Sequence, residues 1–218
     1  MLKPPPSQTP ETLAATVFAH HFTPMTNTKI LIEDYSPSWA VTFQQLKSIY
    51  ELHLSDLVID IQHIGSTAVY GLAAKPVIDI DLIIADRNLL NAVIEKLSLL
   101  GYDHQGNLGI TDRDAFTRRT DNTPLDGSLQ TWQKHNLYVC PADSISLKNH
   151  LALRDFLRNN AEIAREYSDL KKRLALENPY NMDLYVERKT PFIIAILKSA
   201  GFDDIALDNI AQENKARS

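Results

Sequence analysis

Residues 77–84, Val-Ile-Asp-Ile-Asp-Leu-Ile-Ile, limit the fold more than any other segment, because they place two aspartates inside an apolar run. A short run rich in β-branched residues is typical of a buried strand. Side chains two positions apart in a strand point to the same face, about 6.6 Å apart along the chain. We therefore expect Asp79 and Asp81 to share one face, while Ile78 and Ile80 pack on the other.

Two neighbouring carboxylates in an apolar strand repel each other and resist burial. A hard divalent cation, Mg²⁺ (or Mn²⁺), fits such a pair, because it takes one or two protein carboxylates and completes its shell with water and phosphate oxygens. Two ions about 3.5–4 Å apart would clamp a nucleotidyl displacement. We predict that Asp79 and Asp81 are metal ligands and catalytic residues. For an isolated Asp-x-Asp, a half-exposed strand with a polar face is the alternative.

A turn at Gly65, Ser66 and Thr67 precedes this strand. Glycine allows the backbone to approach a ligand closely, and consecutive N–H groups form an anion-binding nest. Ser66 and Thr67 add hydroxyl donors. The tripeptide alone is typical of any turn, but beside the aspartate pair it predicts a phosphate-binding site.

These residues form part of a pattern that resembles a known family signature. In chain order, the pattern consists of His63-Ile-Gly-Ser-Thr, Val69, residues 71–76 (Gly-Leu-Ala-Ala-Lys-Pro) and Ile78-Asp-Ile. It is similar to the GrpB family, a bacterial and fungal family of largely unassigned function. That family resembles a branch of the polymerase-β-like nucleotidyltransferase superfamily, whose mark is a Gly-Ser turn followed by Asp-x-Asp on the next strand. The resemblance covers about residues 29–200.

The resemblance implies a nucleotidyltransferase fold in which Gly65 and Ser66 hold a nucleoside triphosphate and the two aspartates hold the metals. Lys75 is the basic residue that we expect at the phosphates, because it lies inside the motif. Four further residues are candidates for the site: His63, His135, Arg154 and Lys171.

One departure from the superfamily pattern concerns a third carboxylate, which active members supply from a later strand. Here that strand, near residues 135–140, offers His135 and no acid. His135 either takes that place as a metal ligand or phosphate contact, or is an ordinary half-buried histidine. The missing acid weakens the case for transfer chemistry more than the case for binding.

The order of elements predicts an α+β fold, with a small mixed sheet, helices on one side and a helical C-terminal part. The domains expected are a flexible N-terminal extension (1–27), a nucleotidyltransferase-like α/β core (28–142), C-terminal helices packed on it (143–203) and a polar tail (204–218). Strands are expected at 57–61, 77–84, 114–119 and 133–140, and helices at 37–52, 86–100, 144–159, 161–176 and 182–200, the last kinked or split by Pro191.

Composition excludes several classes of protein. The formal net charge is -5, which disfavours nucleic acid as a partner, since duplex binding needs a basic surface. The single cysteine, Cys140, excludes an internal disulfide and a Cys-rich zinc site, and it indicates a cytoplasmic protein. No apolar run approaches the ~20 residues of a membrane span.

Two functions are consistent with these residues. The first is a nucleotidyltransferase that binds a nucleoside triphosphate with Mg²⁺ and transfers a nucleotidyl group to an unknown small-molecule or protein acceptor. The second is a catalytically degenerate nucleotide-binding or accessory module of the same fold.

Overall fold

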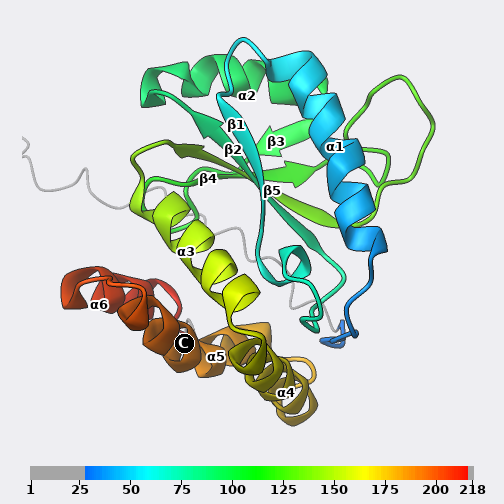
Figure 1. The fold of residues 1–218 in the computed structure, drawn as a ribbon. Helices are drawn as coiled ribbons and strands as arrows, with labels where there is room; N and C mark the ends of the chain where they lie inside the picture. Colours follow the sequence, from blue (N-terminus) through cyan, green and yellow to red (C-terminus); the bar gives the residue numbers. More distant parts are fainter. Residues whose placement is uncertain (1–27, 216–218) are drawn as a thin grey trace, which may run out of the picture.

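The computed structural model describes residues 28–215, so the extension predicted at 1–27 lies outside the described residues. The described part holds one sheet, two short 3₁₀ helices and a series of α-helices (Figure 1). The strands are β1 (Asp60–Ile64), β2 (Ile78–Ile84), β3 (Tyr102–His104), β4 (Asp114–Arg118) and β5 (His135–Pro141), and the helices are α1 (Ser38–Leu54), η1 (Ser66–Ala68), η2 (Arg87–Leu89), α2 (Leu90–Leu99), α3 (Ile145–Asn159), α4 (Ala161–Glu177), α5 (Met182–Ser199) and α6 (Asp204–Glu213).

The sheet has the strand order β1-β2-β5-β4-β3. The central strand, β5, is parallel to its neighbour β2, and the other neighbouring pairs are antiparallel. The sheet is therefore mixed, and the predicted α+β class is confirmed.

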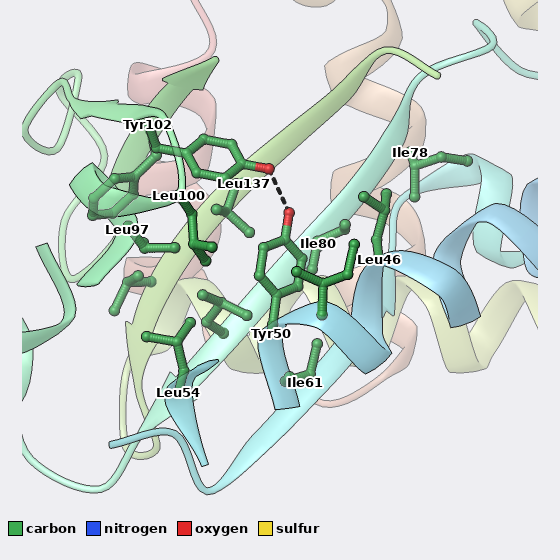
Figure 2. Close-up of a cluster of buried hydrophobic side chains, with 14 of the residues drawn as sticks. Leu46, Tyr50, Leu54, Ile61, Ile78, Ile80, Leu97, Leu100, Tyr102 and Leu137 are labelled. Atoms are coloured by element: carbon green, nitrogen blue, oxygen red, sulfur yellow. Dashed lines mark hydrogen bonds between the residues drawn. The ribbon is translucent and has the colours of Figure 1, made fainter. Parts of the chain in front are cut away.

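The main core lies between the sheet and helices α1 and α2. Leu46, Tyr50 and Leu54 recur every four residues, so they share one face of α1 and are fully buried. Ile80 of β2 meets them from the sheet, as Figure 2 shows. The Tyr50 hydroxyl forms a 2.6 Å hydrogen bond with that of Tyr102, which satisfies two polar groups inside this core.

The opposite face of the sheet carries Asp79, Asp81 and Ile83. Helix α3 packs on the far end of this face, where Leu147 contacts Ile83 and Cys140. Helices α4 and α5 continue from α3, on the side away from α1 and α2 (Figure 1). The aspartates thus lie between the sheet and the C-terminal helices.

Several local predictions were wrong. Residues 57–59 precede the first strand, which is β1 at Asp60–Ile64, and the short strand β3 was not predicted. Pro191 lies inside α5, so the alternative that it splits the helix is wrong. The helix predicted from residue 144 begins at Ile145, because Ser144 is its N-cap and accepts a 3.1 Å hydrogen bond from the Leu147 amide.

The predicted polar tail also contains structure, because α6 covers most of it. Asp203 caps this helix by accepting a 2.8 Å hydrogen bond from the Ala206 amide. Leu207 and Ile210 then pack against Leu197 of α5. Among the described helices, none has the length and apolarity that crossing a bilayer requires.

Truncation of the core face of α1 should destabilise the protein. We expect Leu46→Ala to lower the free energy of unfolding by about 2–5 kcal/mol, because it leaves a cavity at a fully buried position. Leu52→Ala, on the exposed side of the same helix, should change it by less than about 0.5 kcal/mol. Urea denaturation followed by circular dichroism measures both, and equal losses would contradict the assigned face.

Candidate functional site

The turn after β1 lies directly against Asp79. The antiparallel register of β1 and β2 pairs Ile64 with Asp79, so Gly65 passes over that carboxyl group. Gly65 has a φ of 68°, which favours glycine, and a Cβ atom at this position would overlap with Oδ2 of Asp79. The arrangement expected from the sequence, a Gly-Ser turn beside Asp-x-Asp on the next strand, is therefore present.

Each aspartate is held through one of its two oxygens. Asp79 accepts a 2.7 Å hydrogen bond at Oδ1 from Nδ2 of Asn136 on β5. Asp81 is fully buried, and its Oδ2 lies 2.8 Å from Nδ1 of His150 on α3. No donor among the described residues reaches Oδ1 of Asp81. Burial raises the pKa of Asp79, although Asn136 and nearby cations oppose that rise.

Lys171 of α4 contacts the turn from the side of the C-terminal helices. Its side chain is buried, and Nζ donates a 2.8 Å hydrogen bond to Oγ of Ser66. The ammonium also lies 4.5 Å from the centre of the Tyr167 ring. Burial lowers the pKa of Lys171 well below its usual value, and the nearby charge of Lys189 lowers it further.

Three more basic residues complete the surroundings of Asp79. Lys75 lies in the loop before β2, and burial lowers its pKa. Lys189 of α5 is partly buried, and burial together with Lys75 lowers its pKa to about 8. Arg113 is buried with its guanidinium 4.2 Å from the centre of the Tyr138 ring, and its Nε has no acceptor among the described residues.

Two adjoining cavities of about 290 and 200 Å³ open around these side chains. The larger is mostly polar and includes Lys75, Lys171 and Asn136 in its wall. The smaller has more apolar walls, from α3, α4 and α5. Both are lined by Ser66, Asp79, Arg113, Tyr138 and Lys189.

A separate hollow of about 440 Å³ lies along β4 and the start of β5. Two arginines line it, but both are engaged within the protein: Arg118 bonds Asp121, and Arg119 bonds Asp103. The cations around Asp79 have no such carboxylate partners among the described residues, so the cavity at Asp79 is the candidate site.

His63 and Thr67 stabilise the turn through hydrogen bonds within the protein. The Nε2 atom of His63 lies 3.0 Å from Oγ1 of Thr67, whose hydroxyl donates to the Val77 carbonyl at 3.3 Å. The His63 ring stacks on Phe43, and burial lowers its pKa to about 4. The Thr67 hydroxyl is thus engaged within the protein, although the residue borders the larger cavity.

Arg154 of α3 borders the smaller cavity. Its Nη1 donates to Oε1 of Gln62 at 2.6 Å and to the His63 carbonyl at 3.1 Å. Nε and Nη2 bond the Asp155 carboxylate. Arg154 therefore anchors α3 to β1 with its donors already engaged.

The interpretation of His135 as a metal ligand or phosphate contact is wrong. The parallel register pairs Ile78 with His135, so the imidazole points into the core face, away from Asp79. There Nδ1 lies 2.9 Å from the Gln133 carbonyl and Nε2 bonds the Tyr102 hydroxyl. Burial lowers the pKa of His135 to about 4.

Sequence reasoning did not select three residues that the structure brings to the site: Asn136, His150 and Lys189. Asn136 is predictable once β2 and β5 are known to be parallel, since the register then pairs it with Asp79. The other two depend on how α3 and α5 pack, which periodicity does not encode.

The residues present fit one divalent cation better than two. Asp81 offers a buried oxygen without a donor, and Asp79 lies beside it on the same face. One or two carboxylates are the protein share of a typical Mg²⁺ site. Within the described residues no group of three or more His, Cys, Asp or Glu side chains converges to hold a metal. Asp79 and Asp81 would therefore hold a single ion, with the remaining positions left to water and ligand.

The comparisons of the sequence with known proteins agree on one family. The model of the GrpB protein family matches residues 29–199. Glutamate-rich protein GrpB of Alkalihalophilus pseudofirmus is 31% identical over 78% of this chain and 94% of its own length. The UPF0157 protein YqkA of Bacillus subtilis is 30% identical over 79% of this chain, but this match spans only 47% of YqkA.

Solved structures show the same relationship. The crystal structure of conserved protein GrpB from Enterococcus faecalis has a TM-score of 0.66, with 29% identity over 82% of this chain and 98% of that chain. A weaker likeness, with a TM-score of 0.46 and 15% identity, links 66% of this chain to 44% of the MgGTP-bound Cid1 poly (U) polymerase.

A methyl group at Gly65 should disrupt the turn. We expect Gly65→Ala to destabilise the protein by more than Gly71→Ala does, by at least about 1 kcal/mol. Both glycines have positive φ, at 68° and 78°, but only Gly65 has a neighbour that a Cβ would meet. Thermal unfolding of the two variants measures the difference, and equal losses would show that the contact with Asp79 is not tight.

Proposed function

The chain belongs to the GrpB family, and from that premise we propose that its cavity binds a nucleoside triphosphate with Mg²⁺ (or Mn²⁺) and transfers a nucleotidyl group to a small-molecule or protein acceptor. One observation carries the proposal. Four basic side chains and the Ser66 turn surround Asp79 in one pair of cavities.

The charge of the site favours a polyanion. Lys75, Lys171, Lys189 and Arg113 face the cavities together with Asp79. Burial lowers the pKa of each of the three lysines, and repulsion from a neighbouring lysine lowers it further. A ligand with several negative charges offsets this repulsion. Part of the free energy of binding then comes from removing unfavourable electrostatic energy that the free protein already carries.

The residues of the turn and strand have distinct roles in this proposal. The Ser66 hydroxyl and the backbone amides of the turn contact phosphate oxygens. Asn136 and His150 hold the two carboxylates through the oxygens Asp79 Oδ1 and Asp81 Oδ2, which leaves the other oxygens for a cation. The bound ion would neutralise phosphate charge, and the cations of the chain would stabilise the charge that develops at the reacting phosphorus.

A second function, nucleotide binding without turnover, is favoured by a specific observation. No third carboxylate of the described residues joins Asp79 and Asp81, and Asp81 already bonds His150. Release of pyrophosphate in the presence of candidate acceptors separates the two functions, because a binding module releases none.

Nucleotide binding is measured by calorimetry with ATP, GTP, CTP and UTP, each with and without Mg²⁺. We expect at least one nucleotide to bind, and Lys189→Met to weaken it by roughly tenfold or more, because a hydrogen bond to a charged group contributes about 1.5–3 kcal/mol. Asp79→Ala/Asp81→Ala should abolish the Mg²⁺ dependence. Lys198→Met, an exposed position on the same helix, should bind as the wild type does. Binding of no nucleotide would overturn the proposal.

The affinity for a polyanion should fall as the pH rises. Lys189 is charged below its pKa of about 8 and neutral above it, so alkaline pH removes a cation from the free site. With inorganic triphosphate and no metal, we expect the Kd to rise about tenfold from about pH 7 to about pH 9. Lys189→Met should largely remove this dependence, and a flat profile in the wild type would contradict the assignment.

A further inference from the structure

The contact between Lys171 and Ser66 has the features of a proton-transfer pair. Nζ of Lys171 lies 2.8 Å from Oγ of Ser66, and the lysine is only 2% exposed. Its other close neighbour is the face of the Tyr167 ring. No carboxylate of the described residues forms a salt bridge with Lys171, so the buried ammonium has no ion-pair partner.

The charges around Lys171 favour its neutral form. Burial acts first, and Lys189 on α5 and Lys75 before β2 act in the same direction. Asp79 on β2 acts in the opposite direction, but the pKa of Lys171 still lies well below its usual value. A neutral amine has a lone pair that accepts the hydroxyl proton of Ser66, whereas an ammonium only donates.

Ser66 is placed where a nucleophile would meet a bound phosphate. Ser66 is partly exposed and borders both cavities, whereas its partner Lys171 is buried. Arg113 and Lys189 border the same two cavities and supply positive charge for a phosphorus centre under attack. A nucleophile, a base within hydrogen-bond reach and cations for the developing charge thus occur together.

We propose that Ser66 is a nucleophile and Lys171 its general base, so that the protein accepts a phosphoryl group from a phosphoric anhydride on the Ser66 hydroxyl. In this step the bond between Ser66 Oγ and phosphorus forms, and the bridging bond between that phosphorus and its leaving phosphate breaks. The hydroxyl proton passes to Nζ of Lys171, and the leaving phosphate takes the electron pair. The inference goes beyond the proposed function, in which Ser66 only contacts phosphate and the acceptor is another molecule.

The test uses the full chain and two reagents that contain no nucleotide. Inorganic triphosphate with Mg²⁺ probes phosphoryl transfer, and a fluorophosphonate without metal probes the nucleophilicity of serine. Intact-mass measurement followed by peptide mapping should find one adduct at Ser66 with each reagent, and none in Ser66→Ala. Lys172→Met, the exposed neighbour that bonds Asp34, should react as the wild type does.

The variant Lys171→Arg distinguishes a role of Lys171 as general base from a role as a contact to phosphate. Arginine keeps the positive charge and a donor but does not accept a proton near neutral pH. We expect both reactions at Ser66 to slow by at least tenfold in this variant, while its unfolding midpoint confirms that it folds. If Lys171→Arg does not fold, Lys171→Met replaces it under the same criterion.

Three results would overturn the inference: no Ser66 adduct in the wild type, an adduct with fluorophosphonate but not with triphosphate, or unchanged rates in the lysine variant. None of these results depends on nucleotide affinity, which calorimetry measures separately. Failure of the Ser66 reaction is therefore distinguishable from failure of nucleotide binding.

Discussion

The pairing of β1 with β2 is the constraint on which the rest of the site depends. It brings the backbone of Gly65 against the carboxyl group of Asp79, with no space for a side chain between them. The same register turns His63 into the core, where it holds Thr67 and so fixes the path of the turn. The Ser66 hydroxyl then lies toward the C-terminal helices, where it accepts a hydrogen bond from Lys171.

The C-terminal helices complete the site and do not merely cover it. Lys171 on α4 and Lys189 on α5 bring positive charge to a sheet face whose own contribution is two carboxylates. His150 on α3 bonds the fully buried Asp81. Since Arg154 uses its donors to fasten α3 to β1, the position of the helices relative to the aspartates is set by hydrogen bonds as well as by apolar contacts.

The sequence was sufficient to predict the parts of this arrangement that depend on local pattern. The aspartate strand, the turn, the position of Ser66 beside Asp79 and most of the helices follow from spacing and from the resemblance to the GrpB family. His135 was misassigned because residues one apart in a strand face opposite ways, and the register with β2 was needed to decide which face it takes. Helix α6 was missed because its apolar side chains, Leu207 and Ile210, stand among polar residues and become buried only by packing against α5 and α3.

The clustering of cations itself argues that the site serves a ligand. Burial lowers the pKa of Lys75, Lys171 and Lys189, which means that charging these lysines is less favourable in the folded protein than in the unfolded chain. Apolar residues of similar size at these positions would remove that cost, so stability alone does not account for the lysines. A polyanion that enters the cavity turns the same repulsion into attraction.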